Sequence, residues 1–308
     1  MRHQYRRNCS NLRILCIFHP LNRWPDLPRH YLCTLRSGNG YSAYHGSIQT
    51  EIQFQPNDGE QHWFKDWNED RQHKLTASTF AAATGFWRGR RTQLWLEKIG
   101  AIRPFAGNAA TQWSNAKELE ALERYMLITG HSIVLPSFQQ CNASTPDEDW
   151  IGASADGIIE HSLYGLPYDG ILEIKCPYFG ENPPPHHPWS KIPVHYMPQA
   201  QGLMEIIDRN WMDLYCWTPN GSSLFRLHRN RPYWDLLKSA LSDFWWNNVQ
   251  PAREICSMYP VEDPIWQLSS FLPAPKHHRF KDIVYASKHL SCDSRLLLME
   301  GVRGKTFR

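Results

Sequence analysis

The segment GILEIKCP, residues 170–177, most constrains the fold, because it is an apolar strand that carries two opposite charges at fixed spacing. Successive side chains of a strand point to opposite faces, so Glu173 and Lys175 share one face. The apolar residues between them point to the other face. The segment therefore predicts a strand with a carboxylate and an ammonium group side by side.

Asp156 lies at a turn signal, since it follows the apolar-leaning run of residues 150–155 and precedes Gly157. A turn here can bring its carboxylate beside the charged face of the strand. Two carboxylates about 4 Å apart repel each other by roughly 1 to 4 kcal/mol at effective dielectric constants of about 80 to 20. A divalent cation removes that penalty, and hard oxygen ligands favour Mg²⁺. Each motif alone is more often a plain turn or a solvated ion pair, but together they indicate metal-assisted phosphodiester chemistry.

Glu118 lies in a segment with helical periodicity that Gly130 can end. The residues at +3, +4 and +7 from Glu118 are apolar or aromatic, so this spacing puts its carboxylate on the stripe that faces the interior. A buried carboxylate is unfavourable unless it is paired or binds a metal. The spacing therefore predicts a metal ligand, with an acid at the rim of the stripe as the alternative.

The residues after the charged strand predict a helix, with Gln199 and Gln201 near its start, and then a clean alternating strand over 211–218. Asn220-Gly221 is a turn signal that leads into a returning strand. This order of elements predicts an α/β protein, with an α+β mixed sheet and carboxylates gathered at strand ends. Most of the 14 tryptophans are expected to pack in the core.

In their order and spacing these motifs resemble the PD-(D/E)xK nuclease superfamily, specifically its lambda-exonuclease or YqaJ-type viral recombinase family. The matching residues are Arg71, Ser78, Trp113, Glu118, Asp156, Glu173, Lys175, Tyr196 and Gln199. The resemblance covers residues 63–255. The amino-acid sequences of two segments, residues 63–78 and 217–229, are also similar to those of plant organellar members. Ala155 and Ser114 depart from the family pattern, which more often has proline and glycine there, but neither position supplies a metal ligand.

The resemblance implies a restriction-endonuclease-like PD-(D/E)xK core with flanking helices. It implies one or two Mg²⁺ ions, which Mn²⁺ can replace, and the ligands would be Glu118, Asp156, Glu173 and the main-chain carbonyl of Ile174. Lys175 and Gln199 would position the attacking water. The substrate-binding residues would be Arg71, Ser78 and Tyr196, with Arg71 and Ser78 at the 5′-terminal phosphate, where a guanidinium and a helix start suit an anion.

The function implied is that of a Mg²⁺-dependent DNA exonuclease that degrades linear duplex ends, 5′ to 3′ from a 5′-phosphate, in repair or recombination. A DNA-end-binding protein that cuts little, and an endonuclease or RNase on the same core, stay open as alternatives. The resemblance is also compatible with a homo-oligomeric ring and with a single-strand annealing protein as a partner. The basic run at residues 88–91 predicts either phosphate contacts or a solvated loop.

Composition bounds the remaining features. The 308 residues, 42% of them hydrophobic, suffice for one catalytic domain. We expect a leader over 1–60, an exonuclease-like domain over 61–256 and a C-terminal extension without assigned chemistry over 257–308. The net charge of +3 permits nucleic-acid binding without indicating it.

The spacing of the cysteines and the composition of the leader indicate where in the cell the protein is expected. The 8 cysteines include no C-x-x-C pair, which argues against a zinc module and a disulfide framework. No apolar run approaches the roughly 18 residues of a membrane span. Residues 1–50 hold seven arginines and one acid, Asp26. This composition favours a chloroplast or mitochondrial transit peptide, with an untargeted arm as the alternative.

Overall fold

The computed structural model describes residues 73–140, 149–160, 170–180 and 187–301, together with two strands near the N-terminus. These are β1 (Leu12–Leu15) and β2 (Thr34–Ser37), which pair antiparallel. The chain divides into two compact units, residues 1–65 and 66–308. The second unit contains the segments that carry the predicted site.

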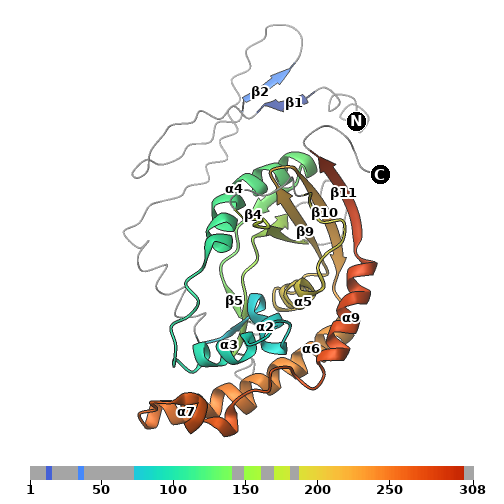
Figure 1. Ribbon diagram of the computed structural model, residues 1–308. Helices are drawn as coiled ribbons and strands as arrows, with labels where there is room; N and C mark the ends of the chain where they lie inside the picture. The colour runs from blue at the N-terminus through green and yellow to red at the C-terminus, as the bar shows by residue number, and fades with distance from the viewer. Residues whose placement is uncertain are drawn as a thin grey trace, which may run out of the picture. The chain divides into compact units, whose positions relative to one another are not determined.

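The second unit is built on a six-stranded mixed sheet in the order β11-β10-β9-β8-β7-β4 (Figure 1). Its strands are β4 (Ser132–Val134), β7 (Gly157–Glu160), β8 (Gly170–Lys175), β9 (Trp211–Thr218), β10 (Gly221–His228) and β11 (Arg295–Gly301). Only the β8–β9 pair is parallel among these six, and the other pairs are antiparallel. The mixed α/β class predicted from the sequence is confirmed.

A smaller sheet supports the segment that leads to Asp156. It has the order β3-β6-β5. Its strands are β3 (Leu75–Thr76), β5 (Gln139–Gln140) and β6 (Ile151–Ala153). β6 is buried along its length and runs directly into the turn before β7, so it fixes where Asp156 leaves the core.

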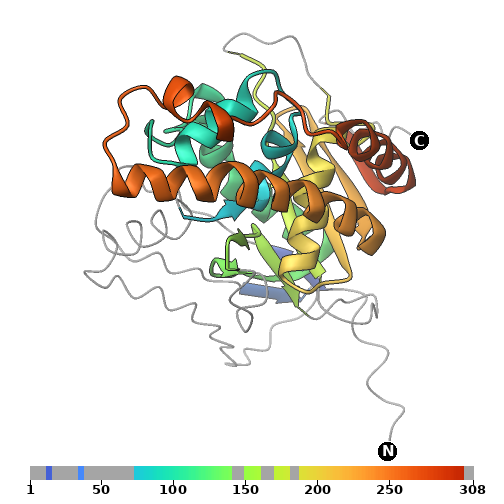
Figure 2. The same ribbon diagram turned by 90° about the horizontal axis from the view of Figure 1, so that it is seen from below.

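Helices cover both faces of the large sheet. The helices of the second unit are α2 (Phe80–Thr84), α3 (Arg90–Lys98), α4 (Ala109–Thr129), α5 (Met197–Ile206), α6 (Arg231–Phe244), α7 (Gln250–Met258), α8 (Pro264–Gln267) and α9 (Phe280–Asp293). Short 3₁₀ helices are η1 (Ala77–Thr79), η3 (Val194–Tyr196) and η5 (Ser269–Phe271), and η4 (Trp245–Val249) is a short π-helix that joins α6 to α7. Figure 2 shows α6, in orange, crossing the molecule beside α5, in yellow.

The two faces of the sheet bury separate apolar clusters. On one face Ala121 and Tyr125 of α4 pack with Leu172 and Ile174 of β8. On the other face α5 and α6 pack with Ile171 and with residues of β9 and β10. Because side chains alternate along β8, Glu173 and Lys175 point to the α5 face. The site must therefore form where α5 meets β8.

The predicted local signals appear where the sequence puts them. Gly130, with φ of 69°, ends α4, because a residue without a Cβ adopts the left-handed conformation at little cost. β9 and β10 form the predicted hairpin, with Thr218 paired to Gly221. Trp234 packs in the core with Leu237, as its helical spacing predicts.

The C-terminal residues form part of the same unit. β11 pairs with β10 as an edge strand, and α9 packs against α5 and α6. Glu300 of β11 accepts two hydrogen bonds from the Arg124 guanidinium of α4, at 2.9 and 2.6 Å, and one from Ser222. The last strand thus ties the sheet edge to the helix on the sheet face.

Gly202 marks the close approach of α5 to α2. A Cβ at this position would lie 2.4 Å from Phe80 Cε2, and Phe80 is fully buried. Although alanine favours helix by about 1 kcal/mol over glycine, we expect Gly202→Ala to destabilise the protein by about 1–3 kcal/mol through overpacking. Denaturant unfolding measures the loss. The double variant with Phe80→Leu should regain part of it, and full stability of Gly202→Ala alone would contradict this packing.

Candidate active site

Asp156 lies beside the charged strand because β7 starts directly after it. Gly157 pairs with Leu172 of β8, and Asp156 Oδ2 accepts a hydrogen bond of 2.7 Å from the main-chain N–H of Ile174. The carboxylate thus acts in place of a main-chain acceptor. It adds one hydrogen bond to β8 at the position just before β7 begins. This contact sets Asp156 next to both Glu173 and Lys175.

Glu173 is the most buried carboxylate of the site, with 2% of its surface exposed. Its Oε1 accepts hydrogen bonds from Lys175 Nζ at 2.5 Å and from Gln199 Nε2 of α5 at 2.6 Å. Its Oε2 is buried, and no residue that the structure describes donates a hydrogen bond to it. A buried carboxylate oxygen without a donor is costly, and a cation is the kind of partner that satisfies it.

The charges of the site do not balance among themselves. Burial, and then the charge of Asp156, raise the pKa of Glu173, against the opposing charge of Lys175. Burial lowers the pKa of Lys175, but the carboxylates of Glu173 and Asp156 raise it by more, so the ammonium form is favoured. One ammonium group therefore faces several acids. A bound divalent cation with a preference for oxygen ligands would supply the missing positive charge.

Glu118 approaches this group from α4, on the other face of the sheet. Desolvation and then the charge of Asp156 raise the pKa of Glu118 to about 7, and the charge of Lys175 opposes this. The side chain is nevertheless exposed, so water screens part of that shift. The prediction that Glu118 is buried on the apolar stripe is wrong: Ala121 and Tyr125 carry the stripe, and Glu118 lies beyond its end, at the rim of the site.

α5 and the turn before it supply the remaining side chains. Lys175 Nζ lies 5.5 Å from the ring centroid of Tyr196, the residue that precedes α5. Burial raises the pKa of Tyr196 and keeps it a neutral phenol. Gln201 instead bonds the main chain at His228 and Asn230, away from the acids. Gln199 is therefore the glutamine of this helix that serves the site.

The predicted phosphate-binding residues are placed only in part. Arg71 lies outside the described residues. Ser78 is exposed in η1, with its hydroxyl 3.2 Å from that of Thr76, and η1 packs against α5. The helix that Ser78 was expected to open begins at Phe80 and has 5 residues, so its dipole is short. The structure thus puts Ser78 near the helix that carries Gln199.

The basic run at residues 88–91 divides between two roles. Arg91 is buried and donates hydrogen bonds of 2.7 Å to the carbonyls of Ala83 and Ala274. It therefore holds α3 to the C-terminal segment through two buried hydrogen bonds, a role that neither reading of the run predicted. Arg88 is exposed. No sequence signal distinguishes Arg88 from Arg91, because both arginines have the same chemistry and only packing separates them.

Among the described residues, the one group of three possible metal ligands whose ligand atoms all lie within 4.8 Å of one another consists of Asp243, His277 and His278. His277 Nδ1 accepts a hydrogen bond from the main-chain N–H of Arg279, so a neutral ring carries its proton on Nε2. That nitrogen lies 3.0 Å from Asp243 Oδ2 and donates to it. Because both ring nitrogens are occupied, this group stabilises the fold and does not offer a metal site.

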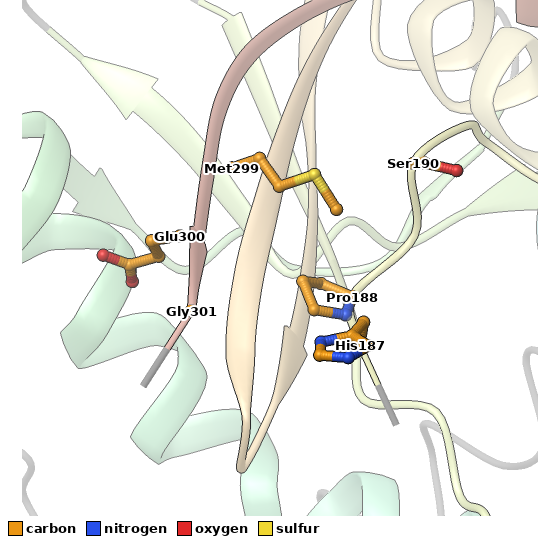
Figure 3. A pocket seen from close by; sticks show the side chains of 6 residues that line it. All are labelled: His187, Pro188, Ser190, Met299, Glu300 and Gly301. Carbon is orange, nitrogen blue, oxygen red and sulfur yellow. The ribbon is translucent and has the colours of Figure 1, made fainter. Parts of the chain in front are cut away.

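A pocket of about 320 Å³ opens between the loop before α5 and β11 (Figure 3). Its lining residues are His187, Pro188, Ser190, Met299, Glu300 and Gly301. Glu300, its one acidic group, is already bonded to Arg124 and Ser222. The pocket is therefore separate from the acids around Glu173, and it contributes none of their ligands.

Asp156 directly before one strand of the mixed sheet, with Glu173 and Lys175 on the next strand, is the arrangement that the predicted PD-(D/E)xK resemblance requires. Residues 66–210 match the family model of the YqaJ-like viral recombinase domain. This match spans the residues, from Arg71 to Gln199, on which the predicted resemblance to the YqaJ-type viral recombinase family rests. No curated protein matches the chain in sequence.

Solved structures that resemble the chain include an alkaline exonuclease (LHK-Exo) from Laribacter hongkongensis. It is 21% identical, covers 63% of this chain and 96% of its own, and has a TM-score of 0.48. The same exonuclease in complex with dAMP gives the same values. A phage related exonuclease from Haemophilus somnus 129PT is 14% identical with a TM-score of 0.42, over 60% of this chain and 96% of its own.

Proposed function

We propose that the protein is a Mg²⁺-dependent DNA exonuclease that hydrolyses phosphodiester bonds from 5′-phosphorylated duplex ends in repair or recombination. The observation that carries this proposal is the hydrogen bonding of the two carboxylate oxygens of Glu173. One of its oxygens is held by Lys175 and Gln199, and the other is buried beside further acids, with no hydrogen-bond donor among the residues that the structure describes. The match of residues 66–210 to the family model of the YqaJ-like viral recombinase domain supports a nuclease.

The residues that would hold the metal are Glu118, Asp156, Glu173 and the main-chain carbonyl of Ile174. When bound, Mg²⁺ supplies Lewis acidity to the scissile phosphate and to the attacking water. The chain itself fixes the geometry. Gln199 and Lys175 hold Glu173 in one orientation, and the cation of Lys175 stabilises negative charge that develops near it. Tyr196 limits the movement of Lys175 from the α5 side.

One assay distinguishes this function from its alternatives. The purified full chain is incubated with Mg²⁺ and either linear duplex DNA, covalently closed circular DNA or RNA, with a chelator as the control. Digestion of linear duplex alone supports the exonuclease. Cutting of closed circles or of RNA would replace it with an endonuclease or an RNase. Binding of duplex ends without digestion would make the protein an end-binding one.

The end-recognition role of Arg71 is a separate prediction. A guanidinium that binds a terminal phosphate makes charge-assisted, bidentate hydrogen bonds. We expect Arg71→Ala to slow digestion of 5′-phosphorylated duplex about ten- to a hundredfold and to leave the slower rate on 5′-hydroxyl ends nearly unchanged. Ser78→Ala should act in the same direction with a smaller effect. Equal slowing on both substrates would show that Arg71 has a general or structural role.

The arginine-rich leader makes import into a chloroplast or mitochondrion part of the proposal. Residues 1–50 contain seven arginines and a single acid, which is typical of transit peptides. We expect residues 1–60 to direct a fused fluorescent protein to an organelle in plant cells. Replacement of Arg2, Arg6, Arg7 and Arg13 by glutamine should return it to the cytosol. A diffuse signal from the unaltered fusion would show an untargeted arm.

A further inference from the structure

An exposed indole lies in the turn between α2 and α3. Trp87 is 41% exposed, although it follows a helix whose residues are all buried. Its neighbour Phe86 turns inward, where its ring packs against Phe280 with centroids 5.3 Å apart. Trp87 itself lies 6.4 Å from Phe86 and 5.4 Å from His195, centroid to centroid. The indole thus contacts two rings and presents about two fifths of its surface to solvent.

These rings continue to the acidic site without a gap. His195 lies 4.3 Å from Tyr196, centroid to centroid, and Tyr196 lies 5.5 Å from Lys175 Nζ. Trp189 also packs against Tyr196, with ring centroids 5.0 Å apart. The row Trp87, His195, Tyr196 therefore runs from solvent to the ammonium group that contacts Glu173. We call these three residues the aromatic row.

The surface beside the aromatic row is basic. Arg88 follows Trp87 in the chain, is exposed, and forms no ion pair with any residue that the structure describes. Lys276 Nζ lies 4.5 Å from the ring centroid of Phe280, which packs against Phe86. Cations next to solvent-facing rings suit a ligand that alternates phosphates with flat bases, which describes a single nucleic-acid strand.

We propose that Trp87 and His195 are a base-stacking platform that holds the DNA strand next to the scissile phosphate. This inference rests on the proposed function, which it extends from phosphate chemistry to the contacts with bases. Base–aromatic stacking is tolerant of sequence, because every base has a flat face. The platform therefore adds affinity for unpaired bases at a frayed duplex end without selecting among sequences.

The test measures binding alone, in Ca²⁺, by fluorescence anisotropy of the full chain. One probe is an oligothymidylate of about 12 nucleotides, within the usual site sizes of about 4–16, and the second is an abasic oligonucleotide of the same length and charge. We expect the protein to bind the first about 5- to 100-fold more tightly. Trp87→Ala should remove most of that preference and leave abasic binding unchanged. His195→Ala should remove a smaller part.

Two further variants serve as controls. Trp87→Phe keeps an aromatic face and should retain part of the preference, which excludes a folding defect. Trp266, which is 76% exposed on α8, is the matched control, and Trp266→Ala should leave both affinities unchanged. Equal losses with both probes after Trp87→Ala, or no loss with either, would overturn the platform.

The two proposals fail in different ways. A chain that digests linear duplex but shows no Trp87-dependent preference for bases overturns the platform alone. A chain that shows this preference but digests no nucleic acid keeps the platform and overturns the nuclease.

Discussion

Glu173→Gln is expected to reduce Mg²⁺-dependent digestion of linear duplex by at least about a thousandfold. The substitution keeps the size and planar geometry of the side chain but removes one negative charge from the acids that would hold the metal. Oε1 already receives two donors, from Lys175 and Gln199, so the amide can retain that geometry. The loss should therefore appear in turnover, and the measurement is a single-turnover rate over a range of Mg²⁺ concentrations.

The matched control for this variant is Glu120→Gln. Glu120 lies on α4 with an exposed side chain that pairs with Lys117 at 2.9 Å, so its charge is solvated and its loss should not affect the rate. DNA binding in Ca²⁺ should remain in both variants, since the substrate contacts are unchanged. If Glu173→Gln keeps a rate near that of the unaltered protein, Glu173 is not a metal ligand and the site assignment fails.

Asp213→Asn is expected to destabilise the fold by about 3–5 kcal/mol. Asp213 is fully buried on β9 and accepts two hydrogen bonds from Arg226, at 2.8 and 2.9 Å, and a third of 2.8 Å from the Tyr125 hydroxyl of α4. Loss of its charge leaves the largely buried guanidinium without its counterion. In thermal unfolding this corresponds to a fall in Tm of roughly 6 to 20 °C.

Asp208→Asn provides the comparison for Asp213. The Asp208 side chain is 84% exposed and pairs with Arg229 at 2.6 Å, so the same chemical change should cost less than about 1 kcal/mol. Asparagine also tolerates the left-handed backbone at this position, where φ is 54°. Equal stabilities of the Asp213 and Asp208 variants would mean that the buried pair contributes no more than a surface one.

The sequence predicted the parts of this fold that depend on local periodicity. The charged strand, the hairpin after Trp211 and the helix ended by Gly130 each follow from residues that are neighbours in the chain. The grouping of Asp156 with Glu173 also followed from a turn signal beside a strand. The family resemblance then supplied Gln199, whose contact with Glu173 spans 26 positions and has no local signature.

What the sequence missed depends on packing between distant segments. The exposure of Glu118 is set by how far along α4 the sheet extends, and periodicity alone cannot give that length. The same holds for Arg91, which is buried because residue 274 offers it a carbonyl. β11 has no alternating pattern, since its residues are half exposed at a sheet edge, and only the unpaired edge of β10 makes it a strand.

The bond between Arg124 and Glu300 has a practical consequence for shortened versions of this protein. A chain cut after residue 256, where the motifs end, would lack β11 and expose the whole edge of β10. An open strand edge recruits strands from other molecules, so such a fragment should aggregate. It would also free Arg124, on the helix that carries Glu118. Insolubility or inactivity of that fragment would then report a missing sheet edge, and it would say nothing about the chemistry of the acids.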